Sequence, residues 1–204
     1  MNAISSTIVP PTSARRMLLL LAAVFFLPFA VGTGLFWSGW RPEKFANHGE
    51  LLQPPRILPD GGLHHPDGNP LPTSELHGKW LLVMSNSEPC RVVCQQDLQQ
   101  MLQVHMALNK EQSRVQRVFI SSDVSARDSA SSLAEAQSRF PDLVVGLWDS
   151  GAAKKTWQGI LESSGRELYV VDPLGNVILR YAAPPDMRGV LKDLERLLKY
   201  SWLR

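Results

Sequence analysis

An apolar run near the start of the chain limits the folds open to it more than any other feature. Residues 17–40 read MLLLLAAVFFLPFAVGTGLFWSGW and carry no charge. Roughly 20 apolar residues in a helix suffice to cross the hydrocarbon core of a bilayer. A cleaved signal peptide would have a shorter apolar core followed by small residues, and a helix buried in a soluble core is a second alternative. The length of the run and the closing Trp37 and Trp40 favour an uncleaved transmembrane anchor over residues 17–40.

The charges beside this run predict its orientation. Arg15 and Arg16 stand directly before it, and basic residues mark the cytoplasmic end of a membrane helix. Residues 1–16 are therefore expected to form a cytoplasmic N-terminal tail. All that follows Trp40 is expected in the periplasm, as part of a single-pass inner-membrane protein; the mitochondrial intermembrane space is the alternative. Such compartments permit disulfides.

The outer part divides into a short stalk and one domain. Residues 41–62 are rich in Pro and Gly, which predicts a stalk or linker. The domain over residues 63–204 alternates short apolar runs with longer amphipathic stretches. Strands are predicted at 80–86, 114–123, 142–149 and twice within 167–181, and helices at 90–110, 125–140 and 185–202. This alternation implies parallel strands with an added antiparallel edge. The predicted fold class is α/β, a thioredoxin-like sandwich with an N-terminal transmembrane helix.

Charge and cysteine content narrow the function. The net charge is +2, which gives no electrostatic footprint for nucleic acid. The only two cysteines are Cys90 and Cys94, separated by three residues. A redox disulfide, a metal-binding pair and a structural staple all fit this spacing. The staple is poorly motivated because so short a loop removes little entropy from the unfolded chain.

The position of the cysteine pair favours chemistry over structure. Cys90 follows the strand predicted at 80–86 and begins the next helix, and sites in open α/β sheets form at the carboxyl ends of strands. A helix N-terminus stabilises a thiolate, and Arg91 adds positive charge. Cys94 lies one helical turn further, in line with Leu98, Met101 and Leu102. We therefore expect an exposed nucleophile at Cys90 and a half-buried resolving thiol at Cys94.

The chain from about Asp67 to Tyr181 resembles the Sco/SenC family of cytochrome oxidase assembly proteins. The resemblance rests on GKWLLVMSNSEPCRVVC, RVQRVFISSDVSARD and LYVVDPLGNVILRY, and the three-residue cysteine spacing is its most specific element. It implies a membrane-anchored, thioredoxin-like protein that services the copper A site as a metallochaperone or a thiol–disulfide reductase. The implied partner is a cytochrome c oxidase subunit or another assembly factor. Asp123 and Asp128 match the acidic pair that the family places after a core strand.

The sequence departs from this family in two places. Gln95 stands where the family has Pro after the second cysteine, and the copper-binding His expected before strand 167–172 is absent from QGILESSGRELYVV. His105 lies about 16 Å along the helix from Cys94, too far to share a metal. His77 begins strand 80–86, at the far end of the sheet, and a solvated loop is expected for His64 and His65. The only metal that the resemblance leaves open is Cu(I) on Cys90 and Cys94.

Three functions follow from these observations. The first is a Sco-like thiol–disulfide oxidoreductase that acts on copper-site cysteines through Cys90 and Cys94. The second is a Cu(I) chaperone that uses the same pair, and the third is a non-catalytic assembly scaffold. A peroxiredoxin is not favoured. Its active-site motif needs Pro at position 83, where this chain has Val, and only Ser87 matches the motif.

Overall fold

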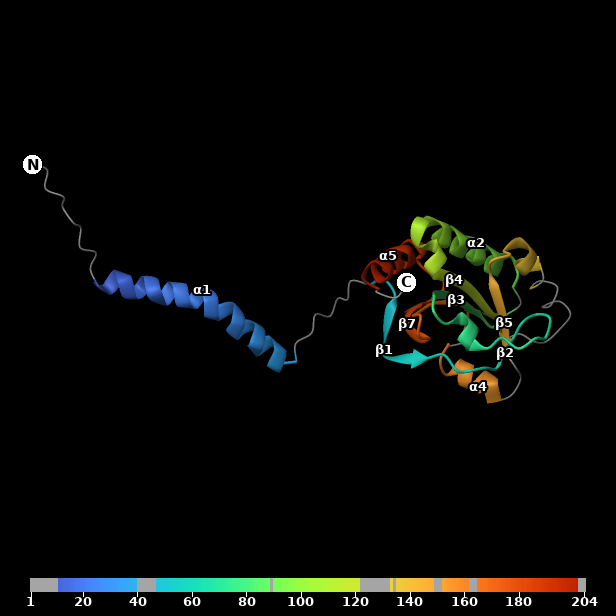
Figure 1. Cartoon of the computed structure of the whole chain (residues 1–204), viewed down its shortest axis with the longest axis horizontal. Helices are drawn as coiled ribbons and strands as arrows, with labels where there is room; N and C mark the ends of the chain where they lie inside the picture. Colours follow the sequence, from blue (N-terminus) through green and yellow to red (C-terminus); the bar gives the residue numbers. More distant parts are fainter. Residues whose placement is uncertain are drawn as a thin grey trace, which may run out of the picture. The chain divides into compact units, whose positions relative to one another are not determined.

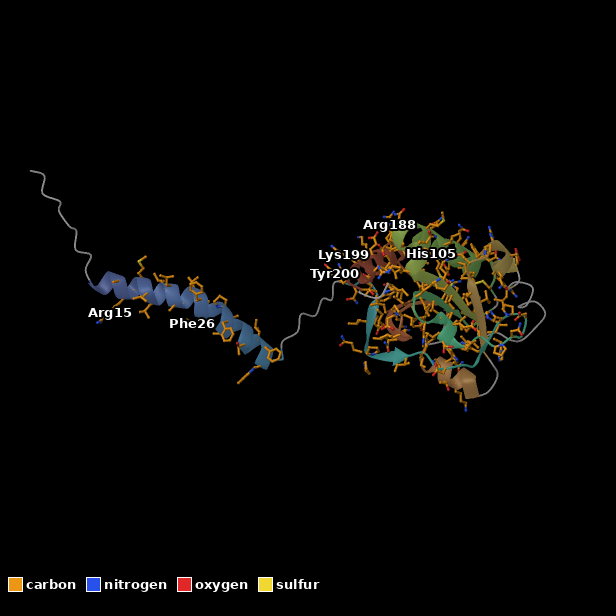
Figure 2. The ribbon with its side chains drawn as sticks, in the orientation of Figure 1. Arg15, Phe26, His105, Arg188, Lys199 and Tyr200 are labelled. Atoms are coloured by element: carbon orange, nitrogen blue, oxygen red, sulfur yellow. A yellow bond between two sulfur atoms is a disulfide. The ribbon has the colours of Figure 1, made fainter. Side chains whose placement is uncertain are left out.

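The computed structural model describes residues 11–39, 47–88, 90–121, 133, 135–148, 152–161 and 165–201. The chain divides into two compact units, Met1–Phe45 and Ala46–Arg204. The first unit contains α1 (Pro11–Trp37), whose segment Ala14–Trp37 is long and apolar enough to cross a membrane. The side chains of Arg15 and Phe26 project from this helix (Figure 2), and Phe26 is 70% exposed. The length and apolar composition of this helix suggest single-pass membrane anchoring.

A seven-stranded mixed sheet forms the centre of the second unit, in the order β1-β7-β6-β3-β4-β5-β2. Strands β3, β4 and β5 are parallel, and the remaining neighbours pair antiparallel. The strands are β1 (Glu50–Ile57), β2 (Leu63–His64), β3 (Trp80–Asn86), β4 (Val115–Ser121), β5 (Val144–Trp148), β6 (Glu167–Val171) and β7 (Asn176–Tyr181). The predicted thioredoxin-like α/β fold with an antiparallel edge is therefore confirmed.

Helices cover both faces of this sheet. Helices α2 (Val92–Ala107) and α5 (Met187–Tyr200) lie side by side on one face, and α4 (Ala152–Gln158) lies on the other (Figure 1). Short 3₁₀ helices occupy Thr73–Leu76 and Asn109–Arg114. Residues 135–139 are helical, and most of the helix predicted over 125–140 lies outside the described residues.

Strand β3 carries the hydrophobic core on both faces of the sheet. Its sequence WLLVMSN is buried at every position, as expected of a central strand covered on both sides. Because side chains alternate along a strand, Leu82 and Met84 pack into the core under α2 and α5, whereas Leu81 and Val83 join a second core with Trp157 of α4.

The predicted stalk is wrong at residues 50–57. Residues 50–57, within the segment 41–62, form β1 and pair with β7 at the edge of the sheet; residues 41–46 lie outside the described part. The strand was hidden by Pro54 and Pro55, which cannot donate ladder hydrogen bonds and are confined to edges. The register shifts between Leu51 and Arg56, around these prolines.

A buried aspartate on α5 ties the start of the second unit to the sheet. Asp193 accepts hydrogen bonds from the backbone N–H groups of His48 at 2.7 Å and Gly49 at 3.0 Å, and from the Tyr181 hydroxyl at 2.8 Å. The His48 ring nitrogen Nδ1 lies 3.1 Å from the same carboxylate. Burial raises the pKa of this carboxyl, but the hydrogen bonds outweigh burial and hold the pKa of Asp193 below its usual value.

Candidate functional site

The cysteine pair lies where the sequence placed it, at the carboxyl edge of the parallel strands. Strand β3 ends at Asn86, which stands in register with Ser121, the last residue of β4. The Asn86 side chain shapes the following loop, since its amide donates to the Glu88 carbonyl at 2.7 Å. Arg91 has an extended backbone and caps α2, whose first residue is Val92. Cys90 therefore precedes the helix, whereas the sequence predicted a helix that begins at residue 90.

Cys90 and Cys94 form a disulfide, with their α-carbons 5.1 Å apart. Each exposes only 3% of its surface and belongs to the core under α2 and α5. The prediction of an exposed Cys90 is wrong for this oxidised state, and Cys94 is also more buried than predicted. The orientation of the helix explains the burial of Cys94. In the first turn of α2, Val92 and Val93 face solvent, 68% and 49% exposed, and Cys94 faces the core.

A cleft of about 450 Å³ opens beside the disulfide. Cys94 is one of its lining residues and Cys90 is not, among the residues described. The full lining is Asn86, Glu88, Arg91, Val92, Val93, Cys94 and Arg166. The lining thus places two arginines, one glutamate and two valines around the accessible side of the pair.

An ion pair that the sequence analysis missed lies next to this cleft. Asp97 is on α2, three residues beyond Cys94, and its Oδ2 lies 3.0 Å from Nε of Arg166. Arg166 directly precedes β6 and lines the cleft. Burial raises the pKa of Asp97, and the Arg166 charge offsets only part of this effect. A signal was present in the sequence, because Asp97 is a carboxylate on the apolar stripe of α2.

The histidines lie apart from the disulfide or serve structural roles. His105 of α2 is more buried than predicted, at 7% exposed, and its Nε2 lies 2.8 Å from the Val115 carbonyl oxygen. His64 is in β2, opposite Leu147, and not in a loop as predicted. His77 packs against Gly175, in the turn between β6 and β7 and thus at the opposite end of β3 from Cys90.

The described residues do not fit the three-ligand copper site of the Sco/SenC resemblance. No group of three or more His, Cys, Asp or Glu side chains in the described ranges could hold a metal ion. Both cysteines and all five histidines are within those ranges, so this finding covers every cysteine and histidine of the chain. Asp123 and Asp128 lie outside the described residues.

Comparison with known proteins assigns the family. A family described as transmembrane-like, thioredoxin-like, C-terminal domain matches residues 80–201, more than half of the chain. The chain belongs to this family. The match runs from the start of β3 to the end of α5 and contains the cysteine pair. No curated protein sequence matches the chain.

Solved structures with a similar fold include Sco proteins. Apo Sco1 from Thermus thermophilus is 22% identical with a TM-score of 0.60, over 76% of this chain and 99% of that chain. Copper-bound yeast Sco1 is 21% identical with a TM-score of 0.59, over 71% and 93%. BsSco, described as a Sco-family cytochrome c oxidase assembly protein with a disulfide switch, is 13% identical with a TM-score of 0.53, over 78% and 100%. The predicted resemblance is confirmed at the level of the fold.

Proposed function

We propose that this thioredoxin-like family member is a Sco-like assembly factor for cytochrome c oxidase. It acts as a thiol–disulfide oxidoreductase on the copper-site cysteines of an oxidase subunit. The observation that carries the proposal is the Cys90–Cys94 disulfide at the carboxyl edge of the parallel strands, beside a cleft. The shared Sco fold supports the choice of partner.

Cys90 is proposed as the nucleophile and Cys94 as the resolving thiol. Cys90 precedes the free N–H groups of α2 and neighbours Arg91, and both favour a thiolate. The Cys90 thiolate attacks a partner disulfide and releases one partner thiolate. The Cys94 thiolate then attacks the Cys90 sulfur of the mixed disulfide and releases the second. The partner gains two electrons, and the pair returns to the buried disulfide.

The proposed location is the inner membrane with the domain in the periplasm. Support comes from the apolar helix α1, from Arg15 and Arg16 before its apolar run, and from the disulfide, which needs an oxidising compartment. Protease added to the outer side of sealed membranes should remove the second unit and leave the N-terminal tail protected. Protection of the second unit would contradict this orientation.

Trapping of a mixed disulfide tests the proposed reaction. The full chain in detergent micelles, reduced and carrying Cys94→Ser, is mixed with the oxidised copper-site domain of an oxidase subunit. We expect a covalent complex through Cys90, visible on non-reducing gels and lost with reductant. Cys90→Ser in place of Cys94→Ser is the matched control and should trap far less complex. A complex that forms equally well with both variants, or with neither, would contradict the proposed roles.

The alternative is Cu(I) carriage by the same two sulfurs. The copper-bound structure of yeast Sco1 supports this alternative. Two thiolates suit Cu(I), whereas Cu(II) is expected to oxidise them to the disulfide. The reduced full chain should therefore bind one equivalent of Cu(I) at most and form no stable Cu(II)–thiolate complex. A persistent thiolate-to-copper charge-transfer band after Cu(II) addition would reveal a further ligand. If Cys90→Ser/Cys94→Ser chains still support oxidase assembly, the non-catalytic scaffold is correct instead.

A further inference from the structure

A cluster of three groups with complementary chemistry lies at the cleft, because Cys94 and Arg166 line it and Asp97 pairs with Arg166. Cys94 and Asp97 are three residues apart on the buried side of α2, a spacing that makes side chains neighbours on one helix face. Arg166 reaches the same place from the segment before β6, lines the cleft with Cys94 and pairs with Asp97 at 3.0 Å. The Asp97 side chain is 11% exposed and that of Arg166 is 30% exposed, so water can reach the group.

We propose that Asp97 exchanges a proton with the Cys94 thiol and that Arg166 positions Asp97 for this exchange. The proposal rests on the proposed thiol–disulfide reaction and assigns its proton path. The Asp97 carboxylate takes the proton of Cys94, directly or through water. The new Cys94 thiolate attacks the Cys90 sulfur of the mixed disulfide and breaks its bond to the partner sulfur. Asp97 then returns the proton to the departing partner thiolate.

Charge conservation is the physical reason for this arrangement. Before the transfer, the cluster contains a carboxylate, a guanidinium and a neutral thiol. After the transfer it contains a neutral carboxyl, the same guanidinium and a thiolate, so its net charge stays at zero. A lone buried thiolate would pay a large desolvation penalty, which the Arg166 charge offsets once Asp97 is protonated. Burial also raises the pKa of Asp97 toward that of a thiol, which makes the transfer less unfavourable.

The other charged groups at this place do not substitute for the pair. Glu88 and Arg91, from the loop between β3 and α2, line the same cleft and are exposed to solvent. Arg166 is the charged group that acts on the Asp97 carboxyl from the segment before β6. Leu98 and Met101 belong to the same hydrophobic core as Cys94.

Stopped-flow reaction of the reduced full chain with a fluorescent glutathione disulfide separates the two steps. The first phase reports attack by Cys90, and the second reports release of the second glutathione by Cys94. In Asp97→Asn we expect the first phase to be unchanged and the second to be slowed about 10- to 100-fold near pH 6. The two chains should converge above pH 9, where Cys94 ionises without a base. Arg166→Gln should show an intermediate pH profile.

Glu195→Gln, which removes an exposed carboxylate from α5, is the control and should keep the wild-type profile. A second phase slowed by the same factor at every pH would indicate a purely structural role and overturn the proton exchange. An unchanged second phase in Asp97→Asn would overturn it as well. The absence of both phases in the wild-type chain would instead refute the thiol–disulfide function, and the proton path with it.

Discussion

Two buried aspartates, on the two helices that cover one face of the sheet, have pKa values shifted in opposite directions. Asp193 of α5 receives two backbone N–H groups, a tyrosine hydroxyl and a histidine ring nitrogen, and its pKa is lowered. Asp97 of α2 has the Arg166 ion pair among the described residues, and burial raises its pKa. The same residue type at similar burial is thus a fixed anion in one place and a carboxyl able to take a proton in the other. The number of donors decides which.

The largest expected contrast is in stability. Asp193→Ala leaves the N–H groups of His48 and Gly49 and the Tyr181 hydroxyl without their acceptor, which should cost about 3 kcal/mol or more of unfolding free energy. Asp97→Ala removes a weakly satisfied charge and should cost about 1 kcal/mol or less. Urea unfolding of the full chain in micelles, followed by tryptophan fluorescence, measures both. Equal losses in the two variants would break the comparison.

The pH dependence of stability should differ in sign. The lowered pKa of Asp193 stabilises the fold above the unfolded-state pKa of about 3.9, and this stability is lost as pH falls through the folded pKa. The raised pKa of Asp97 does the reverse, since stability falls as pH rises from about 3.9 through its folded pKa. Melting temperatures between pH 2 and 7 should therefore become flatter in acid for Asp193→Asn and flatter at higher pH for Asp97→Asn. The same change of slope in both variants would contradict the assignment.

A smaller effect tests one donor of Asp193. Tyr181→Phe keeps the ring and deletes the hydroxyl, so it should cost about 1 kcal/mol, the usual contribution of one hydrogen bond. Tyr200→Phe is the control, because Tyr200 is 69% exposed and should change the unfolding free energy little. Urea unfolding again gives the values. A loss for Tyr181→Phe no greater than that of its control would show that the hydroxyl adds nothing to the Asp193 site.

The smallest effect concerns the cysteines. Alkylation of the reduced chain against pH should give Cys90 a pKa below the roughly 8.5 of a free thiol, because it precedes α2 beside Arg91. Asp97→Asn should alter the titration of Cys94 and leave that of Cys90 in place. Mass spectrometry of the labelled peptides separates the two sites. Faster labelling of Cys94 than of Cys90 would reverse the assigned roles.

The sequence predicted features that depend on local pattern and missed those that depend on distant contacts. The apolar run of β3 and the stripe of α2 marked their elements, and the cysteine spacing marked the site. Strand β1 was not predicted, because Pro54 and Pro55 indicated a stalk. Its pairing with β7 also joins segments far apart in the chain. No pattern in the sequence around Arg166 indicated its ion pair with Asp97. Likewise, no pattern near His48 indicated a partner 145 residues away.

The prolines of β1 affect how readily the edge of the sheet can pair with another copy of the chain. Strand β1 is one end of the sheet, and an open edge invites pairing with the same edge of another copy. A chain confined to a bilayer meets its own copies far more often than a freely diffusing one does. Pro54 and Pro55 have no backbone N–H group to donate, and the register of β1 shifts around them. The edge that looked like a linker is therefore poorly suited to recruit a second strand, which protects neighbouring copies from fusing into a continuous sheet.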